Sequence, residues 1–288
     1  MEIAASSTTR PRSELLRRRD IDSRSWLVAP AVAVVTIVFI YPVFHFLLRS
    51  FSDPVWGLQN FRALIHQPVF LRALANTVVI SGTVTLFCVI LGYPLAYTIA
   101  NTGPSMRRLL IFAVLVPFWS SLLVRTFAWM VLLQQNGLIN HLLLASGLIN
   151  APLALIHNRV GVIIGMVHIL LPFMILPLYS VLLRIDPSYA SAAASLGASP
   201  VSGFLRVYLP LSLPGVVTGT MLVFVIGLGY FITPALLGGP GDTMIAQIIA
   251  MEVSDFGRWG LAGAVALVLL LGASVIFMLV QRSLTTPR

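Results

Sequence analysis

Six apolar stretches follow one another along this chain of 288 residues. Each is long enough to cross the hydrocarbon core of a membrane, which is about 30 Å thick and needs a helix of about 20 residues. The predicted spans are residues 26–48, 73–100, 109–133, 160–183, 211–234 and 260–280. Only 9% of the residues are charged, whereas a soluble domain carries about 25%. The sequence therefore predicts an all-α fold, a polytopic transmembrane bundle of six helices.

The charged residues indicate how this bundle lies in the membrane. All 18 basic residues are arginines, against nine acidic residues, and positive residues close to spans favour the cytoplasmic side. With the N-terminus inside, twelve arginines fall on the inner side and five on the outer side. We therefore expect both termini in the cytoplasm, an Arg-rich segment at residues 1–25 and one six-span domain at residues 26–283. Arginines at helix ends indicate topology and contact with membrane lipid rather than binding of nucleic acid.

Few residues have the pattern of an active site. The single cysteine, Cys88, lies inside an apolar stretch, so no disulfide framework is expected. The sequence has no constellation of His, Cys and carboxylates of metal or nucleophile type, and no phosphate-binding loop of the form G-x-x-x-x-G-K-[ST]. We expect no catalytic residue, no metal and no cofactor. An ion-coupled secondary transporter is a rival class. Such transporters usually carry Asp, Glu or His inside their spans to relay ions or protons. This sequence offers only His45 and His168 near or in a predicted span, and no acidic residue to pair with them.

Residues 184–210 form the longest predicted cytoplasmic loop, which local signals divide into two short helices. Asp186–Pro187 is an N-cap followed by a proline at the first helical position, and Gly197 ends that helix. Ser199–Pro200 repeats the start signal, and the second helix is expected to end at Pro210. The alanines and serines of the first helix would let another backbone approach closely. This helix either inserts into a groove on a partner or rests on the bilayer as a connector.

The loop also carries residues with a regular spacing: Ser191, Ala192 and Ala193, then Gly197, then Val207, Leu209 and Pro210. This pattern resembles the EAA motif of binding-protein-dependent ABC importer permeases. That motif reads Glu-Ala-Ala, three residues, Gly, nine residues, then Ile-x-Leu-Pro. The resemblance implies a type I ABC importer permease fold, with coupling helices that fit a separate ATPase dimer on which ATP is hydrolysed. Ser191 stands where the family has glutamate, so we expect the docking contact to be weaker or to be carried by the second permease subunit.

Further segments are similar to the spermidine/putrescine-type permeases of that family. They are residues 116–119, 123–129, 136–140, 171–179 and 234–245. The resemblance implies a multi-pass protein of the bacterial inner membrane that works with a second related permease subunit, the ATPase dimer and a periplasmic solute-binding protein. The implied cargo is a small organic solute, with a polyamine such as spermidine or putrescine as the first expectation. The alternative cargo is a carboxylated solute, such as an amino acid derivative or an opine.

Five residues are candidates for the translocation path: Trp119, Arg125, Trp129, Tyr230 and Asp242. Aromatic faces and outer carboxylates would favour an organic cation, although each aromatic side chain could instead pack in the core or face lipid, and Asp242 could be a turn residue. Arg125 is the only charge within a predicted span and lies about 24 Å along it, near the outer interface. It either reaches the headgroups or forms a gate or an anionic-group contact, which would suit a carboxylated solute.

Two glycines in the fifth predicted span indicate how the helices pack. Gly215 and Gly219 are four residues apart and therefore lie on the same face of the helix. Such a pair lets another backbone approach closely. We expect this face to contact another span or the partner permease.

Overall fold

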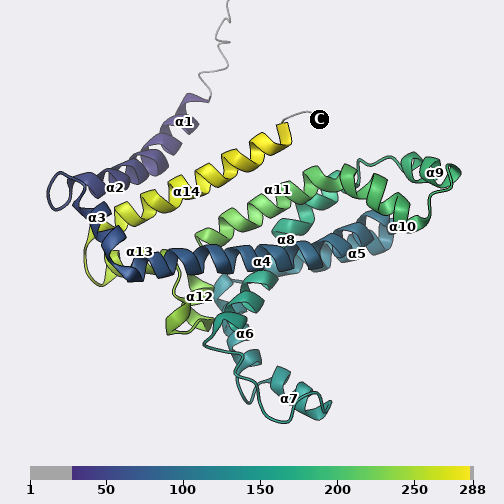
Figure 1. Cartoon of the computed structure of the whole chain (residues 1–288), viewed down its shortest axis with the longest axis horizontal. Coiled ribbons are helices and arrows are strands. Elements are labelled where there is room, and N and C mark those ends of the chain that lie inside the picture. The colour runs from purple at the N-terminus through teal and green to yellow at the C-terminus, as the bar shows by residue number, and fades with distance from the viewer. Residues whose placement is uncertain (1–27, 286–288) are drawn as a thin grey trace, which may run out of the picture. The chain divides into compact units, whose positions relative to one another are not determined.

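The computed structural model describes residues 28–285, apart from the side chains of Ala190 and of residues 283–285. Every regular element within this range is a helix, as the sequence predicts. The described residues up to Phe46 belong to one compact unit and the residues from Leu47 onward to a second (Figure 1). The predicted Arg-rich segment at residues 1–25 lies outside the described residues.

The first span is an apolar helix that runs without a break from Ala29 to Ser52. It consists of α1 (Ala29–Val35), a π-helical turn η3 (Thr36–Ile40) and α2 (Tyr41–Ser52). The π turn ends two residues before Pro42. Proline has no N–H and clashes with the carbonyl of residue i−4, and a π turn relieves this clash by widening the helix locally. Most apolar side chains of this helix are exposed, which suits contact with lipid.

Three long helices of the second unit pack side by side and form its core: α4 (Pro68–Asn101), α8 (Arg159–Leu182) and α11 (Leu209–Leu228). The core residues are apolar and fully or almost fully buried; they include Ile80, Val84, Met166, Leu170, Met174, Ile175, Leu178 and Val223. With 34 residues, α4 is about 51 Å long at 1.5 Å per residue, so it extends beyond the predicted span 73–100.

Glycines allow the three core helices to approach closely. A Cβ atom on Gly219 of α11 would lie 2.6 Å from Met174 Sδ and 3.0 Å from the Met174 carbonyl oxygen on α8. A Cβ on Gly215 would lie 3.2 Å from Leu178 Cα. Gly92 of α4 meets Met174 in the same way, at 2.9 Å from Cγ. The expectation that Gly215 and Gly219 face another span is confirmed, and that span is α8.

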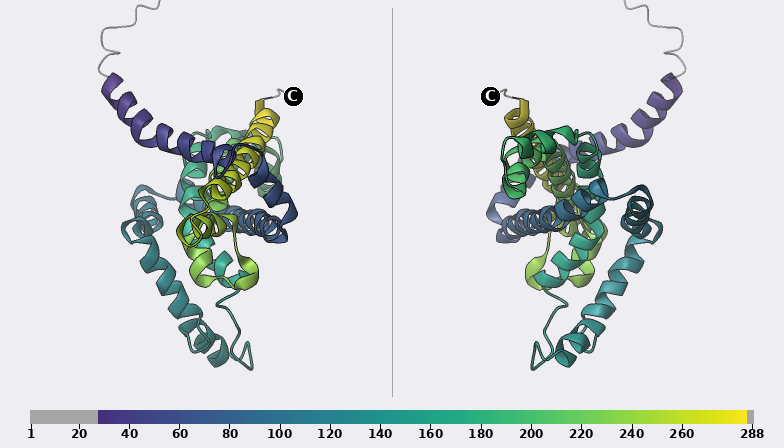
Figure 2. Two further views of the ribbon diagram at one scale, coloured as in Figure 1. Left: turned by 90° about the vertical axis from the view of Figure 1, so that its left-hand side faces the viewer. Right: turned by 90° about the vertical axis from the view of Figure 1, so that its right-hand side faces the viewer.

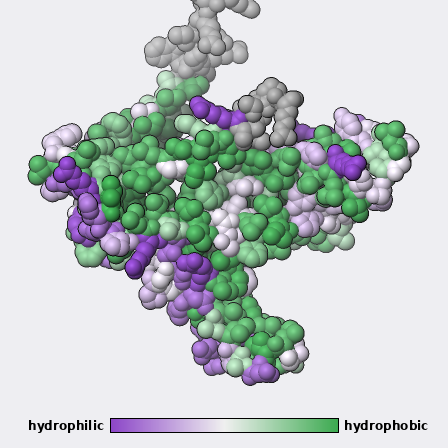
Figure 3. All heavy atoms as spheres, in the orientation of Figure 1, coloured by the Kyte–Doolittle hydropathy of each residue, from purple (hydrophilic) through white to green (hydrophobic). Residues whose placement is uncertain are grey.

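A second apolar cluster joins the start of α4 to α3 (Gln59–His66), α13 (Ile245–Ser254) and α14 (Trp259–Thr285). Its buried members are Leu64, Phe70, Ala73, Ile245, Ile248, Leu261, Ala264 and Val265. In the face shown in Figure 3, apolar residues cover most of the long helices and hydrophilic residues gather toward their ends. This distribution is the one a bundle surrounded by hydrocarbon requires.

The third predicted span, residues 109–133, is not one straight helix. It consists of α5 (Pro104–Leu115), a 3₁₀ turn η4 (Val116–Trp119) and α6 (Leu122–Leu133), with a bend of 98° at the break. Ser120 and Ser121 are both extended there, and the Ser120 hydroxyl donates to the Pro117 carbonyl at 2.9 Å. After α6 comes α7 (Leu138–Ala145), which projects away from the long helices (Figures 1 and 2).

The fifth predicted span ends at Pro234, and the structure shows that this end is wrong. The helix α11 ends at Leu228, and a separate short helix α12 (Ile232–Leu237) contains Pro234. Gly229 caps α11, because its N–H reaches the Ile226 carbonyl instead of continuing the α-helical ladder. A 3₁₀ turn η6 (Pro240–Asp242) then leads to α13.

The predicted loop helices are α9 (Ser188–Ser195) and α10 (Pro200–Gly203). Contrary to the prediction, Pro210 does not end the second helix. Instead α10 continues through a π turn η5 (Phe204–Tyr208) into α11, so that one helix runs from Pro200 to Leu228. As at Pro42, the π turn ends two residues before the proline, and the Leu209 N–H donates to the Phe204 carbonyl five residues earlier.

Candidate functional site

The helix α9 is held at both ends by the signals read from the sequence. The Asp186 carboxylate accepts a hydrogen bond from the Ser188 N–H at 2.8 Å, and this N–H lowers the pKa of the Asp186 carboxyl below its ordinary value. At the other end Gly197 has a φ of +80°, its N–H donates to the Ala194 carbonyl, and the Ala198 N–H donates to the Ala193 carbonyl at 3.0 Å. This is a Schellman motif, which a glycine at C′ favours.

The seven motif residues divide into two groups in space. Ser191, Ala192 and Gly197 are exposed, and Ala193 is half-buried. Val207, Leu209 and Pro210 lie instead in the π turn and the first turn of α11. The first group therefore forms an outer surface, whereas the second belongs to the helix that enters the core.

Two apolar side chains extend the exposed surface of the loop. Leu196 is 89% exposed and Val201 is 68% exposed. Single exposed apolar residues are common on any protein. Here they lie near Gly197 on a short loop whose neighbouring side chains are small, so they offer two exposed apolar side chains beside a surface of small residues.

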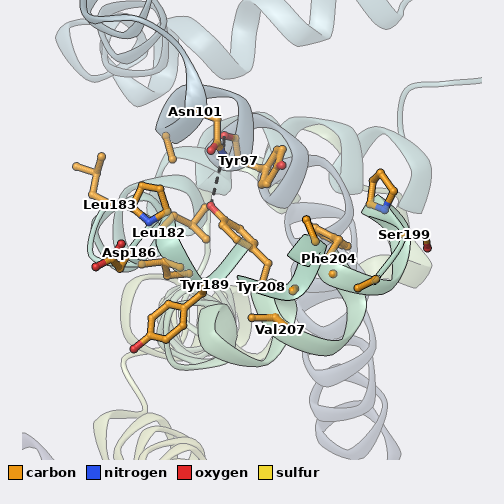
Figure 4. Close-up of a pocket in the computed structure, with 18 of the residues that line it drawn as sticks. Tyr97, Asn101, Leu182, Leu183, Asp186, Tyr189, Ser199, Phe204, Val207 and Tyr208 are labelled. Atoms are coloured by element: carbon orange, nitrogen blue, oxygen red, sulfur yellow. Dashed lines mark hydrogen bonds between the residues drawn. The ribbon is translucent and has the colours of Figure 1, made fainter. Parts of the chain in front are cut away.

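A cavity of about 660 Å³ lies on the inner side of the loop (Figure 4). One part of its wall comes from α9 and α10, including Tyr189, Ala193 and Ala194. The other part comes from the ends of α4 and α8, including Tyr97 and Leu182. The cavity thus separates the loop from the ends of α4 and α8.

Three aromatic rings line the cavity where it meets the bundle, Tyr97, Phe204 and Tyr208. Together with Tyr93, which lies one turn earlier on α4 and contacts Phe204, we call them the aromatic joint. Tyr97 of α4 makes edge-to-face contacts with Phe204 and Tyr208 of the π turn, at centroid distances of 5.8 and 5.1 Å. Tyr93 meets Phe204 in the same way at 5.9 Å. The Asn101 amide also donates to the Tyr208 hydroxyl at 3.4 Å.

Three of the five predicted path residues, Arg125, Trp129 and Tyr230, form one connected group with His168. Arg125 of α6 interacts electrostatically with His168 of α8 and with Tyr230, which lies between α11 and α12. The ring of Trp129 lies 5.6 Å from that of His168, at an interplanar angle of 68°. Among the described residues, Arg125 Nε and His168 Nδ1 are buried and have no hydrogen-bond partner. We call these four residues the Arg125 cluster.

The Arg125 cluster lies beside two breaks in the helices. The bend at Ser120 and Ser121 is one turn before Arg125, and the break after Leu228 contains Tyr230. Inside a membrane, non-helical backbone is tolerated only where protein buries it or where it lines a water-filled space. The cluster therefore combines unpaired polar atoms with interrupted helices.

The other two predicted path residues have their contacts elsewhere. Asp242 forms an ion pair with Arg159 at 3.0 Å and accepts a hydrogen bond from the Gly239 N–H at 3.4 Å, which fits the turn role considered for it. Arg159 also donates to Asn76, so this network ties η6 to α4 and α8. Trp119 is 73% exposed and packs on Phe112 at 5.9 Å.

Sequence reasoning missed His168 and the aromatic joint as parts of the site. From the sequence, His168 is only a proton-relay candidate without an acid beside it, whereas in the structure its charged neighbour is Arg125 on another helix. The joint had a signal in the sequence, because Tyr93 and Tyr97, and likewise Phe204 and Tyr208, are spaced four residues apart and so share a helix face.

Comparison with known proteins identifies the family. Residues 89–285 match the model of the "binding-protein-dependent transport system inner membrane component". The chain is 36% identical over 222 residues to the spermidine/putrescine transport system permease protein PotB of Haemophilus influenzae, which covers 77% of each chain. It is 34% identical to PotB of Escherichia coli K12, covering 79% of this chain and 83% of that one.

A solved structure shows the same fold. It is a bacterial ABC transporter involved in the import of the acidic polysaccharide alginate, matched with a TM-score of 0.73 at 22% identity over 92% of this chain and 97% of that one. A second structure of an alginate ABC transporter, in complex with an alginate-bound periplasmic protein, matches with a TM-score of 0.72. The family match and the relatives together show that this chain belongs to the inner-membrane permease components of binding-protein-dependent ABC importers.

Proposed function

We propose that this permease imports a polyamine such as spermidine or putrescine. The observation that carries the proposal is the 36% identity, over 77% of the chain, to a permease named for these two solutes. Trp129 and Tyr230 of the Arg125 cluster are aromatic, and aromatic faces attract organic cations.

We further propose the partners and the orientation of the chain. Residues 26–283 form the permease domain, both termini face the cytoplasm, and the loop at residues 184–210 faces an ATPase dimer. A second, related permease subunit completes the transmembrane part, and a periplasmic binding protein delivers the solute to the opposite side. Membership of a family of binding-protein-dependent transport components supports the last partner.

The exposed surface of the loop supports docking of the ATPase by shape. Ser191 and Ala192 offer small side chains, and Leu196 and Val201 protrude beside them. Buried apolar anchors surrounded by near-neutral contacts carry most of the energy of protein interfaces. The absence of an acid at position 191 removes one charged contact and leaves the apolar anchors in place.

Transport would then follow alternating access. A loaded binding protein contacts the outer segments, and closure of the ATPase dimer on ATP moves the loops of the two permease subunits toward each other. The long helices rotate and open the central path first outward and later inward. The permease itself performs no hydrolysis.

A second candidate cargo, a carboxylated solute, is favoured by the Arg125 cluster. Arg125 Nε and His168 Nδ1 are buried without hydrogen-bond partners among the described residues. No Asp or Glu occurs within any described span. A guanidinium donor in this position suits a carboxylate better than a polycation.

The deciding experiment is uptake by the complete transporter in proteoliposomes, with ATP inside and the cognate binding protein outside. ATP-dependent uptake of labelled spermidine or putrescine, together with binding of the same solute by the binding protein, is the expected result. Uptake of an opine or amino acid derivative instead, lost in the Arg125→Gln variant, would establish the second candidate. Uptake of neither class would overturn both.

A further inference from the structure

The cavity behind the loop limits the ways in which α9 can move the long helices. Its volume of about 660 Å³ lies between α9 and the ends of α4 and α8. A cavity cannot transmit a displacement of α9 to the helices on its other side. Instead, α9 packs mainly on α10 and on the π turn η5. A displacement of α9 therefore reaches the bundle through the chain on either side of the loop and through whatever the π turn contacts.

The π turn contacts α4 through the aromatic joint. Tyr97 stands edge-to-face against both Phe204 and Tyr208, at 5.8 and 5.1 Å, and Figure 4 shows the side chains of this region around the cavity. Tyr93 adds a third such contact, and its hydroxyl shares a hydrogen bond of 2.9 Å with Ser212 of α11. Rings in edge-to-face contact have a preferred mutual orientation, so rotation of the π turn moves them together with α4.

The hydrogen bonding of the helix from Pro200 to Leu228 is irregular at the π turn. Its hydrogen bonds run from residue i to residue i+5, a form that occurs mostly as single turns and often at functional sites. Pro210 removes the N–H that a regular helix would use there. The helix from Pro200 to Leu228 is thus continuous but has one turn of different geometry, and this turn carries Phe204 and Tyr208.

We propose that Tyr97 and Phe204 are positioning residues for energy coupling. Their contact passes the movement of the ATPase-bound loop to α4, and hence to the core of the permease. This inference rests on the proposed docking of an ATPase at α9 and α10. It assigns to the joint a task separate from docking, because the joint lies on the inner side of the loop and the docking surface lies on the outer side.

A purely structural role would have a different signature. If the joint only stabilised the fold, its loss would lower the amount of intact complex, and uptake and ATP hydrolysis would fall in proportion. If it transmits movement, the ATPase still binds and hydrolyses ATP, but fewer solute molecules enter for each ATP. The ratio of uptake to hydrolysis separates the two roles.

The test uses the complete transporter in proteoliposomes and compares Tyr97→Leu and Phe204→Leu with the wild type. Each substitution removes a ring and keeps an apolar side chain. The control is Phe277→Leu, the same loss of a ring on α14, at a side chain that is 47% exposed and belongs neither to the joint nor to the Arg125 cluster. We expect the uptake per ATP to fall about three- to tenfold in both test variants, and to be unchanged in the control. Tyr97→Phe, which keeps the ring, should restore the ratio.

The double variant sharpens the test. If the two rings act through their mutual contact, combining Tyr97→Leu with Phe204→Leu lowers the ratio little further than either change alone. An unchanged ratio in both single variants, or uptake and hydrolysis falling together, would overturn the role of the joint while leaving docking intact. Failure of the wild-type permease to bind the ATPase would instead overturn the proposed function on which this inference rests.

Discussion

Small residues occur in two regions of this permease, with opposite consequences. In the three-helix core, Gly215 and Gly219 lie against α8, where an added Cβ atom would meet backbone and side-chain atoms at 2.6 to 3.4 Å. In the loop, Ser191 and Ala192 are exposed to solvent. The core glycines serve contacts within the chain, and the loop residues leave a surface open for another protein. Substitutions that enlarge these residues should therefore damage folding in the first region and association in the second.

The largest effect is expected in the core. Gly219→Leu would place a branched side chain against Met174, and overpacking of this kind costs about 1–3 kcal/mol or more. We expect a large fall in the thermal unfolding temperature of the permease in detergent, with aggregation in place of a monodisperse peak. Gly82→Leu in α4 is the control, because a Cβ at Gly82 has no neighbour within 4 Å. Equal stability of the two variants would contradict the proposed importance of this packing.

The next largest effect is expected at the surface of the loop. Leu196→Glu places a charge on a side chain that is 89% exposed, so the fold should tolerate it. If Leu196 is an anchor of the ATPase interface, its loss costs about 2 kcal/mol or more. This corresponds to about a thirtyfold weaker binding of the ATPase, measurable by co-purification or by interferometry.

A matched control separates docking from general surface effects. Leu148→Glu makes the same change after α7, at a residue that is 74% exposed. The ATPase should bind this variant with wild-type affinity. If both variants bind equally well, Leu196 is not an anchor and the apolar account of docking fails.

The two regions also differ in how much of them the sequence could predict. The ends of α9 are set by local signals, because Asp186 and Gly197 form hydrogen bonds with residues close to them in the sequence. Both ends lie within one residue of the prediction. The bend at Ser120 and Ser121 was missed, because apolar residues continue across it and hydropathy alone joins them into one span.

The remaining differences come from contacts between distant segments. The sequence predicts a helix end at Pro210, because a proline ring clashes with the carbonyl four residues earlier in a regular helix. Nothing in the sequence shows that a π turn precedes Pro210 and lets the helix continue. The Arg125 cluster joins three separate elements, α6, α8 and the break before α12. The sequence identifies Arg125, Trp129 and Tyr230 as individual candidates. It cannot show that His168 lies beside Arg125, because this position depends on how the helices pack.

A smaller effect is expected at the glycine that ends α9. Gly197 has a φ of +80°, and a residue with a Cβ costs about 1–2 kcal/mol in that conformation. Gly197→Ala should loosen the end of α9 and leave the core unchanged, so that hydrogen exchange accelerates in residues 188–199 only. Gly203→Ala is the control, because an added Cβ there would meet Ala193 at 3.9 Å, an ordinary contact. Uniformly faster exchange across the protein would mean that the loop and the core do not behave as separate regions.

The smallest effect is expected at the position where this chain departs from its family motif. Ser191 is exposed, so Ser191→Glu should leave the permease as stable as before while offering the ATPase a carboxylate. An exposed ion pair contributes about 0.2–1 kcal/mol, which predicts ATPase binding that is up to about fivefold tighter. Because salt screens such a pair, the gain should disappear when the ionic strength is raised to about 1 M. A gain that persisted in high salt would arise from packing instead, and no change at either ionic strength would show that docking here depends on shape alone.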